Sequence, residues 1–398
     1  MLKDKMNRMN FRVLTVFGTR PEAIKLAPVV AELKKEKKIR SYVCVTGQHR
    51  HMLEQVLKIF SIKPDIDLNI MKIDQSLEDI VFGVMNGMVK VFDKIKPDIV
   101  LVQGDTTTAF IVALSAFFRK VKVAHVEAGL RSYDKFKPYP EEVNRRLLSH
   151  VADLHFAPTG GAAENLKKEN IDKNTIFVTG NTVIDALLEI AGRKEGSLSR
   201  RSDEKWLSKI TGGKKIILVT AHRRESFGQD MDEMFRAIRE IAVSRSDVEI
   251  VYPVHLNPNV RRQVSGILKN VPRVHLVEPL EYDSFVRLMK RSCIILTDSG
   301  GVQEEAPALN KPVLVMRHIT ERPEGVEAGC AMLVGTKRRD IVRGVVRLLD
   351  DPKLYFKMAK SKNPYGNGTA AKKIVGILKD KLSKTSYNKT APGGRRKK

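Results

Sequence analysis

The sequence has little of what disulfide-rich, zinc-binding or membrane-spanning proteins need. Its 398 residues include three cysteines and one tryptophan, and Cys44, Cys293 and Cys330 lie far apart without metal-ligand spacing. This argues against a disulfide scaffold and against a zinc module. No apolar run reaches the roughly 18–20 residues that cross a bilayer. Residues 1–10 lack the apolar segment of a secretory signal. We therefore expect a cytoplasmic protein with a flexible stretch at 1–10, no metal, no cofactor and no membrane partner.

The charge is strongly of one sign, because 71 Lys and Arg residues face 46 Asp and Glu residues, for a net charge of +25. The stretch 372–398 carries ten of these cations against Asp380 alone, which predicts a disordered basic tail at 384–398. Aromatic residues for base stacking are scarce there, with Tyr387 as the one example. We expect a basic surface that favours anionic substrates, and no specific nucleic-acid binding.

Short apolar, β-branched runs alternate with amphipathic helical stretches along the chain. With 42% hydrophobic residues, the sequence can bury two cores. Runs that are apolar throughout are typical of parallel strands buried on both faces. The first group of predicted strands is 11–17, 41–45, 98–102, 121–126, 154–157 and 176–178. The second group is 216–220, 248–253, 273–277, 293–297, 312–316 and 332–334. The sequence therefore predicts an α/β protein with two doubly wound parallel sheets, in domains 11–181 and 182–367.

Ligands of open α/β sheets bind beyond the carboxyl ends of the strands, so the residues that follow the predicted strands are candidate site residues. In the first half these include Arg20 and Lys25, after a Gly18 turn that lacks the dinucleotide fingerprint. Asp105, Glu127 and Glu141 are the candidate acids. Asp105 could instead cap a helix, and Glu141 could simply favour a helix dipole. A cluster of three carboxylates could separate their pKa values and supply both a general acid and a general base.

The second half offers cations and a glycine-rich turn. His222 stands beside Arg223 after one strand and His255 follows the next, which suggests an anion site; no motif supports a metal site. Ser299, Gly300 and Gly301 join a buried strand to a helix, where free backbone N–H groups can bind phosphate. Glu305 follows one turn later and could accept hydrogen bonds from a ribose. Phe285 could line a base pocket or belong to the core. Together these residues predict binding of a nucleoside diphosphate.

The chain resembles the non-hydrolysing UDP-N-acetylglucosamine 2-epimerases from about residue 11 to about residue 382. The resemblance lies in co-linear motifs that occur in the family's order: GTRPEAIKLAPVV, QHRHML, VLVQGDTTT, HVEAGLR, YPEEVNR, HRRESFG, YPVHLNPNVR, LTDSGGVQEEAP, TERPE and NPYGNG. It implies two Rossmann-like domains in the glycosyltransferase-B arrangement, with the active site in the interdomain cleft. It also implies a C-terminal helix, at 368–383, that crosses back to the first domain, and a homodimer.

The resemblance implies reversible epimerisation at C2, which interconverts UDP-N-acetylglucosamine and UDP-N-acetylmannosamine for cell-envelope polysaccharides. UDP would leave to give 2-acetamidoglucal and would then add back. By motif position, Asp105, Glu127 and Glu141 would transfer protons, without assignment of acid and base, and His222 would assist departure of UDP. The matching substrate-binding positions are Arg20, Lys25, Asp105, Glu127, His222, Leu280, Phe285, Ser299, Gly300, Gly301, Glu305 and Arg322. Leu280 replaces a glutamine of some relatives, so only a backbone contact could persist there.

Other readings remain open at the level of the sequence. A second UDP-N-acetylglucosamine activates some relatives, and the positions matching its site are Gln48, His51, Glu141, Arg223 and His255, although His51 replaces a glutamine. A hydrolysing epimerase would instead release free N-acetylmannosamine and UDP. A glycosyltransferase of the same architecture would need an acceptor. A basic-tailed binding protein would need no catalytic carboxylates.

Overall fold

A computed structural model describes residues 11–47, 50–72, 75–193, 206, 209, 212–223 and 226–390. The chain divides into two compact units: unit 1 is Met1–Ala186 with Gly368–Lys398, and unit 2 is Leu187–Asn367. Helix α8 (Thr182–Gly192) contains the border, which the sequence had placed just ahead of it. The predicted flexible segment 1–10 lies outside the described residues.

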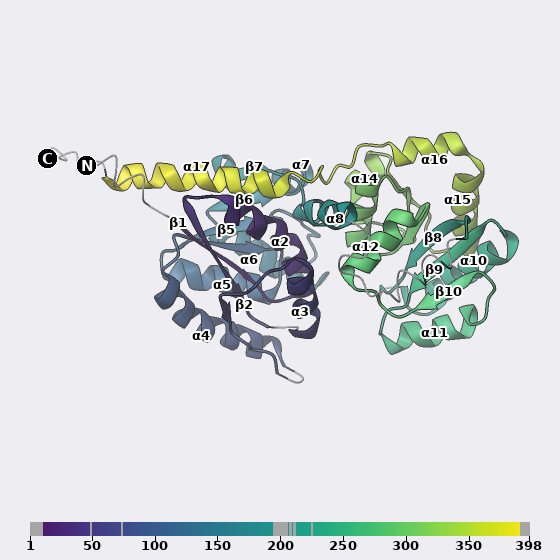
Figure 1. Cartoon of the computed structure of the whole chain (residues 1–398), viewed down its shortest axis with the longest axis horizontal. Coiled ribbons are helices and arrows are strands. Elements are labelled where there is room, and N and C mark those ends of the chain that lie inside the picture. The colour runs from purple at the N-terminus through teal and green to yellow at the C-terminus, as the bar shows by residue number, and fades with distance from the viewer. Residues whose placement is uncertain are drawn as a thin grey trace. The chain divides into compact units, whose positions relative to one another are not determined.

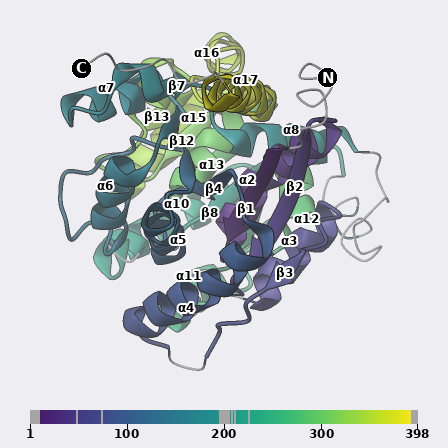
Figure 2. The same cartoon turned by 90° about the vertical axis from the view of Figure 1, so that its left-hand side faces the viewer.

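Unit 1 contains a seven-stranded parallel sheet in the order β3-β2-β1-β4-β5-β6-β7. Figure 2 shows β1 and β2 side by side in this sheet. The strands are β1 (Phe11–Phe17), β2 (Ile39–Val45), β3 (Ile66–Asp67), β4 (Ile99–Gln103), β5 (Lys122–Val126), β6 (Leu154–Ala157) and β7 (Ile176–Val178). All but β3 were predicted from the sequence, with ends that differ by one or two residues. The order reverses at β1, so the loops after β1 and β4 leave neighbouring strands at a point where such sheets bind ligands.

Helices pack on this sheet in two rows, one with α2 and α17 and the other with α4, α5 and α6. The helices of unit 1 are α2 (Arg20–Lys35), α3 (Arg50–Ile59), α4 (Leu77–Ile95), α5 (Thr107–Phe118), α6 (Glu141–Val151), α7 (Gly160–Lys168) and α17 (Ala370–Thr390). The sequence analysis missed α4. Its start is nonetheless encoded, because Ser76 accepts the Asp79 N–H at 3.1 Å and Asp79 accepts the Ser76 N–H in a capping box.

Helix α17 returns to unit 1 and packs against α2 (Figure 1). The N–H groups of Ala370 and Ala371 donate to the Asp185 carboxylate at 3.2 and 2.9 Å, and Lys379 pairs with Glu36 at 2.9 Å. A carboxylate at a helix N-terminus satisfies free backbone donors and favours the helix dipole. The helix continues to Thr390, beyond the predicted helix end at residue 383, and residues 391–398 lie outside the described part of the chain.

Unit 2 contains a six-stranded parallel sheet in the order β10-β9-β8-β11-β12-β13. Its strands are β8 (Lys215–Thr220), β9 (Val248–Pro253), β10 (Val274–Val277), β11 (Ile294–Thr297), β12 (Val313–Val315) and β13 (Ala331–Leu333). Its helices are α10 (Gln229–Ser244), α11 (Pro258–Leu268), α12 (Tyr282–Arg291), α13 (Gly300–Glu305), α14 (Pro323–Glu327), α15 (Arg338–Asp350) and α16 (Pro352–Ala359). The order reverses at β8, and β8 and β11 are therefore the strands whose ends are expected to meet a ligand.

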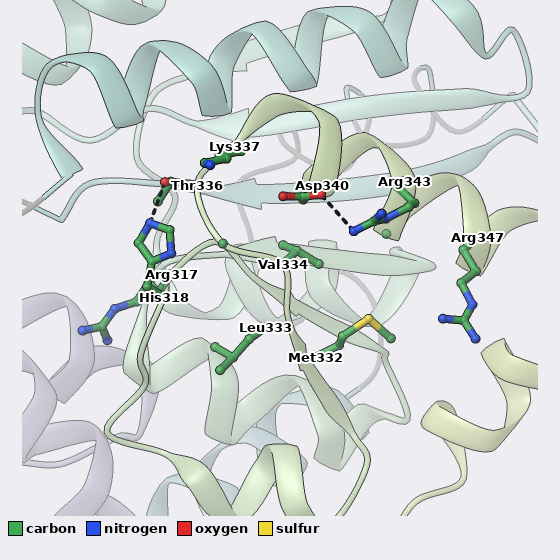
Figure 3. Close-up of a pocket in the computed structure, with 12 residues that line it drawn as sticks. Arg317, His318, Met332, Leu333, Val334, Thr336, Lys337, Asp340, Arg343 and Arg347 are labelled. Carbon is green, nitrogen blue, oxygen red and sulfur yellow. Dashed lines mark hydrogen bonds and ion pairs between the residues drawn. The ribbon is translucent and has the colours of Figure 1, made fainter.

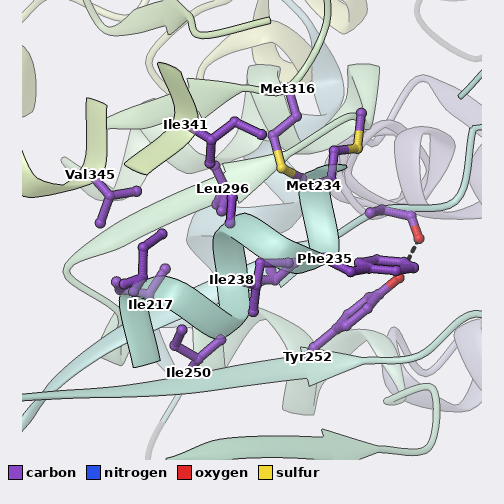
Figure 4. Packing of buried hydrophobic residues seen from close by; sticks show 14 of the residues in the cluster. Ile217, Met234, Phe235, Ile238, Ile250, Tyr252, Leu296, Met316, Ile341 and Val345 are labelled. Carbon is purple, nitrogen blue, oxygen red and sulfur yellow. Dashed lines mark hydrogen bonds between the residues drawn. The ribbon is translucent and has the colours of Figure 1, made fainter. Parts of the chain in front are cut away.

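The core of unit 2 is built from the apolar strands and from the inner faces of α10 and α15 (Figure 4). Phe235 packs against Tyr252 with ring centroids 5.9 Å apart, and the Tyr252 hydroxyl donates to the Ala221 carbonyl at 2.5 Å. This contact satisfies a buried phenol and holds the backbone that leads to His222. The predicted class, two α/β units with parallel sheets, is confirmed. No helix in the described ranges is long and apolar enough to cross a membrane.

Candidate active site

Glu127 is the most firmly held acid of unit 1. It follows β5 directly, in the left-handed backbone region at φ 63°, and it is buried. Lys25 Nζ, from α2, lies 2.7 and 2.6 Å from its two carboxylate oxygens. Gln103 Nε2 also donates to this carboxylate, and Asn181 Nδ2 donates at 3.2 Å. A buried carboxylate is tolerated when it is paired and hydrogen-bonded, and these contacts fix its orientation.

Asp105 leaves the neighbouring strand β4, whose last residue Gln103 is in register with Val126. It does not cap the following helix, because the Thr106 side chain does so by accepting the Ala109 N–H at 3.0 Å. The Asp105 carboxylate instead pairs with Arg145 of α6. The alternative that Asp105 serves as a helix cap is therefore wrong, and its partly exposed carboxylate stays available to a ligand.

Glu141 opens α6 and differs from its neighbour Glu142. Glu141 Oε2 is buried and has no hydrogen-bond partner among the described residues. Burial raises the pKa of Glu141, and the nearby charge of Asp105 raises it further. Glu142 is fully buried and accepts the N–H groups of Ser132 and Tyr133 at 2.9 and 3.1 Å, so it holds the preceding loop. Glu141 is thus the acid with a free oxygen, close to Asp105.

Glu22 connects the loop after β1 with the loop that carries Asp105. It accepts the N–H groups of Gly18 and Thr19 at 3.0 and 2.7 Å, and the Thr106 hydroxyl at 2.7 Å. Burial raises its pKa. Arg20, the first residue of α2, is half-buried beside this network. Sequence reasoning assigned no role to Glu22, although the spacing Thr-x-x-Glu is the capping-box signal.

His222 forms a polar cluster in unit 2 with a residue that sequence reasoning missed. Asp298 is fully buried, and its Oδ2 accepts the N–H groups of His222 and Arg223 at 2.7 and 2.8 Å. Its Oδ1 lies 3.5 Å from His222 Nδ1. The His255 ring stacks on His222 with centroids 5.2 Å apart. Burial lowers the pKa of His222, Asp298 opposes that shift, and the charges of His255 and Arg223 lower the pKa further. Asp298 therefore holds the backbone at His222 and Arg223, and its Oδ1, which has no hydrogen-bond partner among the described residues, lies beside the imidazole.

The loop Ser299–Gly301 leads into α13, and two guanidinium groups approach it. A Cβ at Gly300 would lie 3.5 Å from Arg223 Nη2 and 3.8 Å from Arg322 Nη2, so glycine leaves room for these groups and for a ligand. Arg322 pairs with the buried Glu304. Backbone amides at a strand-to-helix turn with arginines beside them are typical of phosphate binding.

Acidic and aromatic side chains hold these arginines in place. Glu321 lies 3.6 Å from Arg223 and 3.0 Å from Arg317. Although burial opposes it, the Arg317 hydrogen bond and the nearby guanidinium charges lower the pKa of Glu321 to about 2. The Tyr365 hydroxyl donates to the Arg322 carbonyl at 3.3 Å and accepts the Gly325 N–H at 3.1 Å. Tyr365 was quoted within NPYGNG but was given no role, because its contacts are set by tertiary structure.

The remaining predicted residues are placed as follows. Leu280 and Phe285 are half-buried, just before and within α12, and Glu305 is the last residue of α13. Gln48 lies outside the described residues, as does the side chain of His51, so the predicted second nucleotide site is described only in part. Over the described ranges, no three His, Cys, Asp or Glu side chains are grouped so that they could hold a metal ion.

Comparisons with a family model, with curated proteins and with solved structures all find UDP-N-acetylglucosamine 2-epimerases. A family model described as UDP-N-acetylglucosamine 2-epimerase matches residues 31–379. The UDP-N-acetylglucosamine 2-epimerase of Bacillus subtilis is 53% identical over 381 residues, 96% of this chain and 97% of that protein. The Campylobacter jejuni protein of the same name is 52% identical over 371 residues, 92% of this chain and 97% of its own. The crystal structure of the Neisseria meningitidis UDP-GlcNAc 2-epimerase bound to UDP-GlcNAc is 50% identical with a TM-score of 0.86, covering 93% of this chain and 100% of that one.

Proposed function

Because the chain belongs to the UDP-N-acetylglucosamine 2-epimerase family, we propose that it interconverts UDP-N-acetylglucosamine and UDP-N-acetylmannosamine and keeps the sugar attached to UDP in both. The observation that carries this proposal is that one unit holds a group of carboxylates and the other holds a group of cations. Unit 1 presents the carboxylates of Asp105, Glu127 and Glu141, and unit 2 presents cations around a phosphate-type loop. The proposal requires both sets of residues to serve one substrate molecule.

The reaction starts with breakage of the C1–O bond to UDP and loss of the C2 proton, which gives 2-acetamidoglucal. In the gluco substrate the leaving group and the C2 hydrogen are trans-diaxial, so anti elimination is available. UDP then adds back to C1 while a proton returns to C2 from the other face. Positive charge develops at the anomeric carbon and negative charge on the leaving diphosphate, so the site needs carboxylates near the sugar and cations at the diphosphate.

The proposed roles of the diphosphate-binding residues and of His222 rest on contacts described above, and the remaining roles rest on the family resemblance. Arg223 and Arg322 approach Gly300, where the diphosphate would bind with Ser299 and Gly301. His222, oriented by Asp298, would stabilise or protonate the departing UDP oxygen. In the same proposal Glu305 binds the ribose, Leu280 and Phe285 receive the base, and Arg20 contributes to the anion site.

The carboxylates divide the proton transfers. Glu141 has a raised pKa and an unpaired oxygen, which suits a group that holds and gives a proton. Glu127 accepts hydrogen bonds from Lys25, Gln103 and Asn181, an arrangement that stabilises negative charge opposite a cationic anomeric carbon. Asp105, paired with Arg145 and partly exposed, is the candidate to remove the C2 proton.

Reaction in D₂O tests the proposal. With UDP-N-acetylglucosamine as the substrate, deuterium should appear at C2 of both epimers, and the sugar should stay attached to UDP. The fate of the sugar separates the rivals, because accumulation of free N-acetylmannosamine with UDP identifies a hydrolysing enzyme. Transfer of the sugar without deuterium at C2 identifies a glycosyltransferase. Either result overturns the proposal.

We also propose a homodimer that forms through the apolar face of α4 and α5. Phe82 is 66% exposed on α4, and Phe117 and Phe118 are 60% and 65% exposed at the end of α5, which packs against α4. Large apolar side chains exposed on neighbouring helices are candidate subunit contacts. Light scattering should give a dimer mass for the wild type and a monomer mass for Phe82→Asp/Phe118→Asp; an unchanged mass would rule out this face.

Two finer points belong to the same proposal. A second UDP-N-acetylglucosamine would activate the enzyme through Gln48, His51, Glu141, Arg223 and His255. Lag-free turnover of pure UDP-N-acetylmannosamine, measured without UDP-N-acetylglucosamine, would argue against this activation. The product would supply N-acetylmannosamine-type sugars to cell-envelope polysaccharides.

A further inference from the structure

A cationic groove of about 610 Å³ lies in unit 2 between the edge strand β13 and helix α15 (Figure 3). It contains none of the residues proposed for the epimerase reaction. Its charged lining residues are Arg317, Lys337, Asp340, Arg343 and Arg347. This cavity is large enough for a ligand the size of a small organic phosphate.

The groove wall is one face of α15. Asp340, Arg343, Gly344 and Arg347 follow the spacing i, i+3, i+4 and i+7, so they lie on the same side of the helix. A Cβ at Gly344 would lie 2.8 Å from Val334 Cγ1, so glycine lets the helix approach the sheet closely at this point. Residues four apart on a helix have Cβ atoms about 5–6 Å apart, which puts two guanidinium groups within reach of one ligand.

The charge of the groove is not balanced by its own residues. Arg343 pairs with Asp340 at 2.8 Å, and Asp340 is the one acid that lines the groove. Across the described ranges, neither the Arg347 guanidinium nor the Lys337 ammonium contacts a carboxylate. Lys337, Arg343 and Arg347 against Asp340 leave two uncompensated positive charges, and Arg317, the fourth cation of the lining, pairs with Glu321, which is not part of the lining. A ligand with at least two negative charges would compensate them.

The floor of the groove is apolar, and its rim offers hydrogen bonds. Leu333, at the end of β13, is 37% exposed, and the edge position of β13 leaves one side of the strand without a neighbouring strand among the described residues. His318 Nε2 lies 3.0 Å from the Thr336 hydroxyl at one end of the groove. An apolar surface with cations beside it fits a ligand that carries phosphate on a less polar body.

We propose that this groove is a second anion site, which binds a small molecule of the phosphate-ester or polyphosphate class with Lys337, Arg343 and Arg347. The guanidinium groups of Arg343 and Arg347 would hold the phosphate oxygens by charge-assisted hydrogen bonds, and Lys337 would add a point charge at the start of α15. The site does not depend on the proposed epimerase function.

Isothermal titration with inorganic pyrophosphate tests the proposal on the full chain. The titration is done in an Arg322→Ala background, so that binding at the proposed nucleotide site is weakened and the groove dominates the signal. Arg343→Gln/Arg347→Gln should weaken pyrophosphate binding at least tenfold. Arg236→Gln/Arg239→Gln removes the same charge from exposed positions on α10 and should change the affinity less than twofold. Epimerase turnover of the groove variant, made without the Arg322 change, should equal that of the wild type.

Two results would overturn the groove site: unchanged affinity in the groove variant, or equal weakening in the α10 variant, which would mean that net charge alone attracts the anion. Thermal unfolding shows whether the groove variant is folded. If it is not, Lys337→Gln, a change at an exposed position, serves instead and should weaken binding about threefold. The titration measures binding and involves no turnover. If the groove binds pyrophosphate but no deuterium appears at C2 in D₂O, the epimerase proposal fails and the groove site stands.

Discussion

Removing Lys25 from its contact with Glu127 should destabilise unit 1 strongly. The Glu127 side chain is 3% exposed, and Lys25 Nζ lies within 2.7 Å of both of its oxygens. In Lys25→Met the Glu127 carboxylate keeps its hydrogen bonds from Gln103 and Asn181. It loses its ion pair with the Lys25 ammonium. Breaking a buried ion pair from one side costs about 3–5 kcal/mol, because a charge stays buried without compensation.

The double variant separates this effect from a general loss of packing. Glu127→Gln alone should cost less, because Lys25 is 19% exposed and its ammonium can reach water. Lys25→Met/Glu127→Gln removes both charges, and we expect its unfolding free energy to lie within about 1.5 kcal/mol of the wild type. All three variants should have strongly lowered turnover, since Glu127 needs both its charge and its position. The double variant would then have nearly the stability of the wild type but little of its activity.

The assay is chemical or thermal unfolding followed by a probe in unit 1. A loss of 3–5 kcal/mol corresponds to a fall in Tm of roughly 6–20 °C for a domain of this size. A double-mutant cycle with a coupling energy below about 0.5 kcal/mol would refute the reasoning, since residues in direct contact normally couple more strongly than that.

Further predictions concern the reaction itself. Asp105→Asn should lower turnover by about 10²–10⁴-fold, the usual contribution of a general base, and Glu127→Gln should lower it by about 10²–10³-fold because it removes the negative charge opposite the anomeric carbon; near-wild-type rates in both would remove the assignment. The raised pKa of Glu141 places a limb of the kcat/KM profile above pH 4.5, with activity lost as the pH rises through it, and Glu141→Gln should abolish that limb. Asp298→Asn removes the charge that raises the pKa of His222, so any His222 limb should move to lower pH while KM changes little; an unmoved limb would contradict the positioning role of Asp298.

The sequence by itself determined the class of fold and the approximate position of the site. Short apolar runs such as Phe11–Phe17 and Val248–Pro253 are typical of parallel strands buried on both faces. Stretches with the amphipathic period of a helix lie between these runs. The residues that follow such runs must collect at the carboxyl edge of a sheet. For this reason the sequence alone identifies Asp105, Glu127 and His222 as candidate site residues.

Elements without a strong local pattern were harder to predict. β3 has two residues, too few for a period of two to be recognised. The end of α17 was placed too early, because its polar last turns look like a tail when the docked part of the helix is ignored. Helix α4 carried a readable signal in its capping box at Ser76, and the sequence analysis did not use it.

Tertiary structure alone decided which polar groups meet. Lys25 contacts Glu127 across 102 residues of sequence, and Asp298 receives the His222 N–H across 76. Parallel strands are joined by crossovers, so the ends of adjacent strands come from distant segments, and no local pattern encodes such pairs. Burial then raises the pKa of Glu141 and lowers that of His222, because desolvation acts only once the chain is folded.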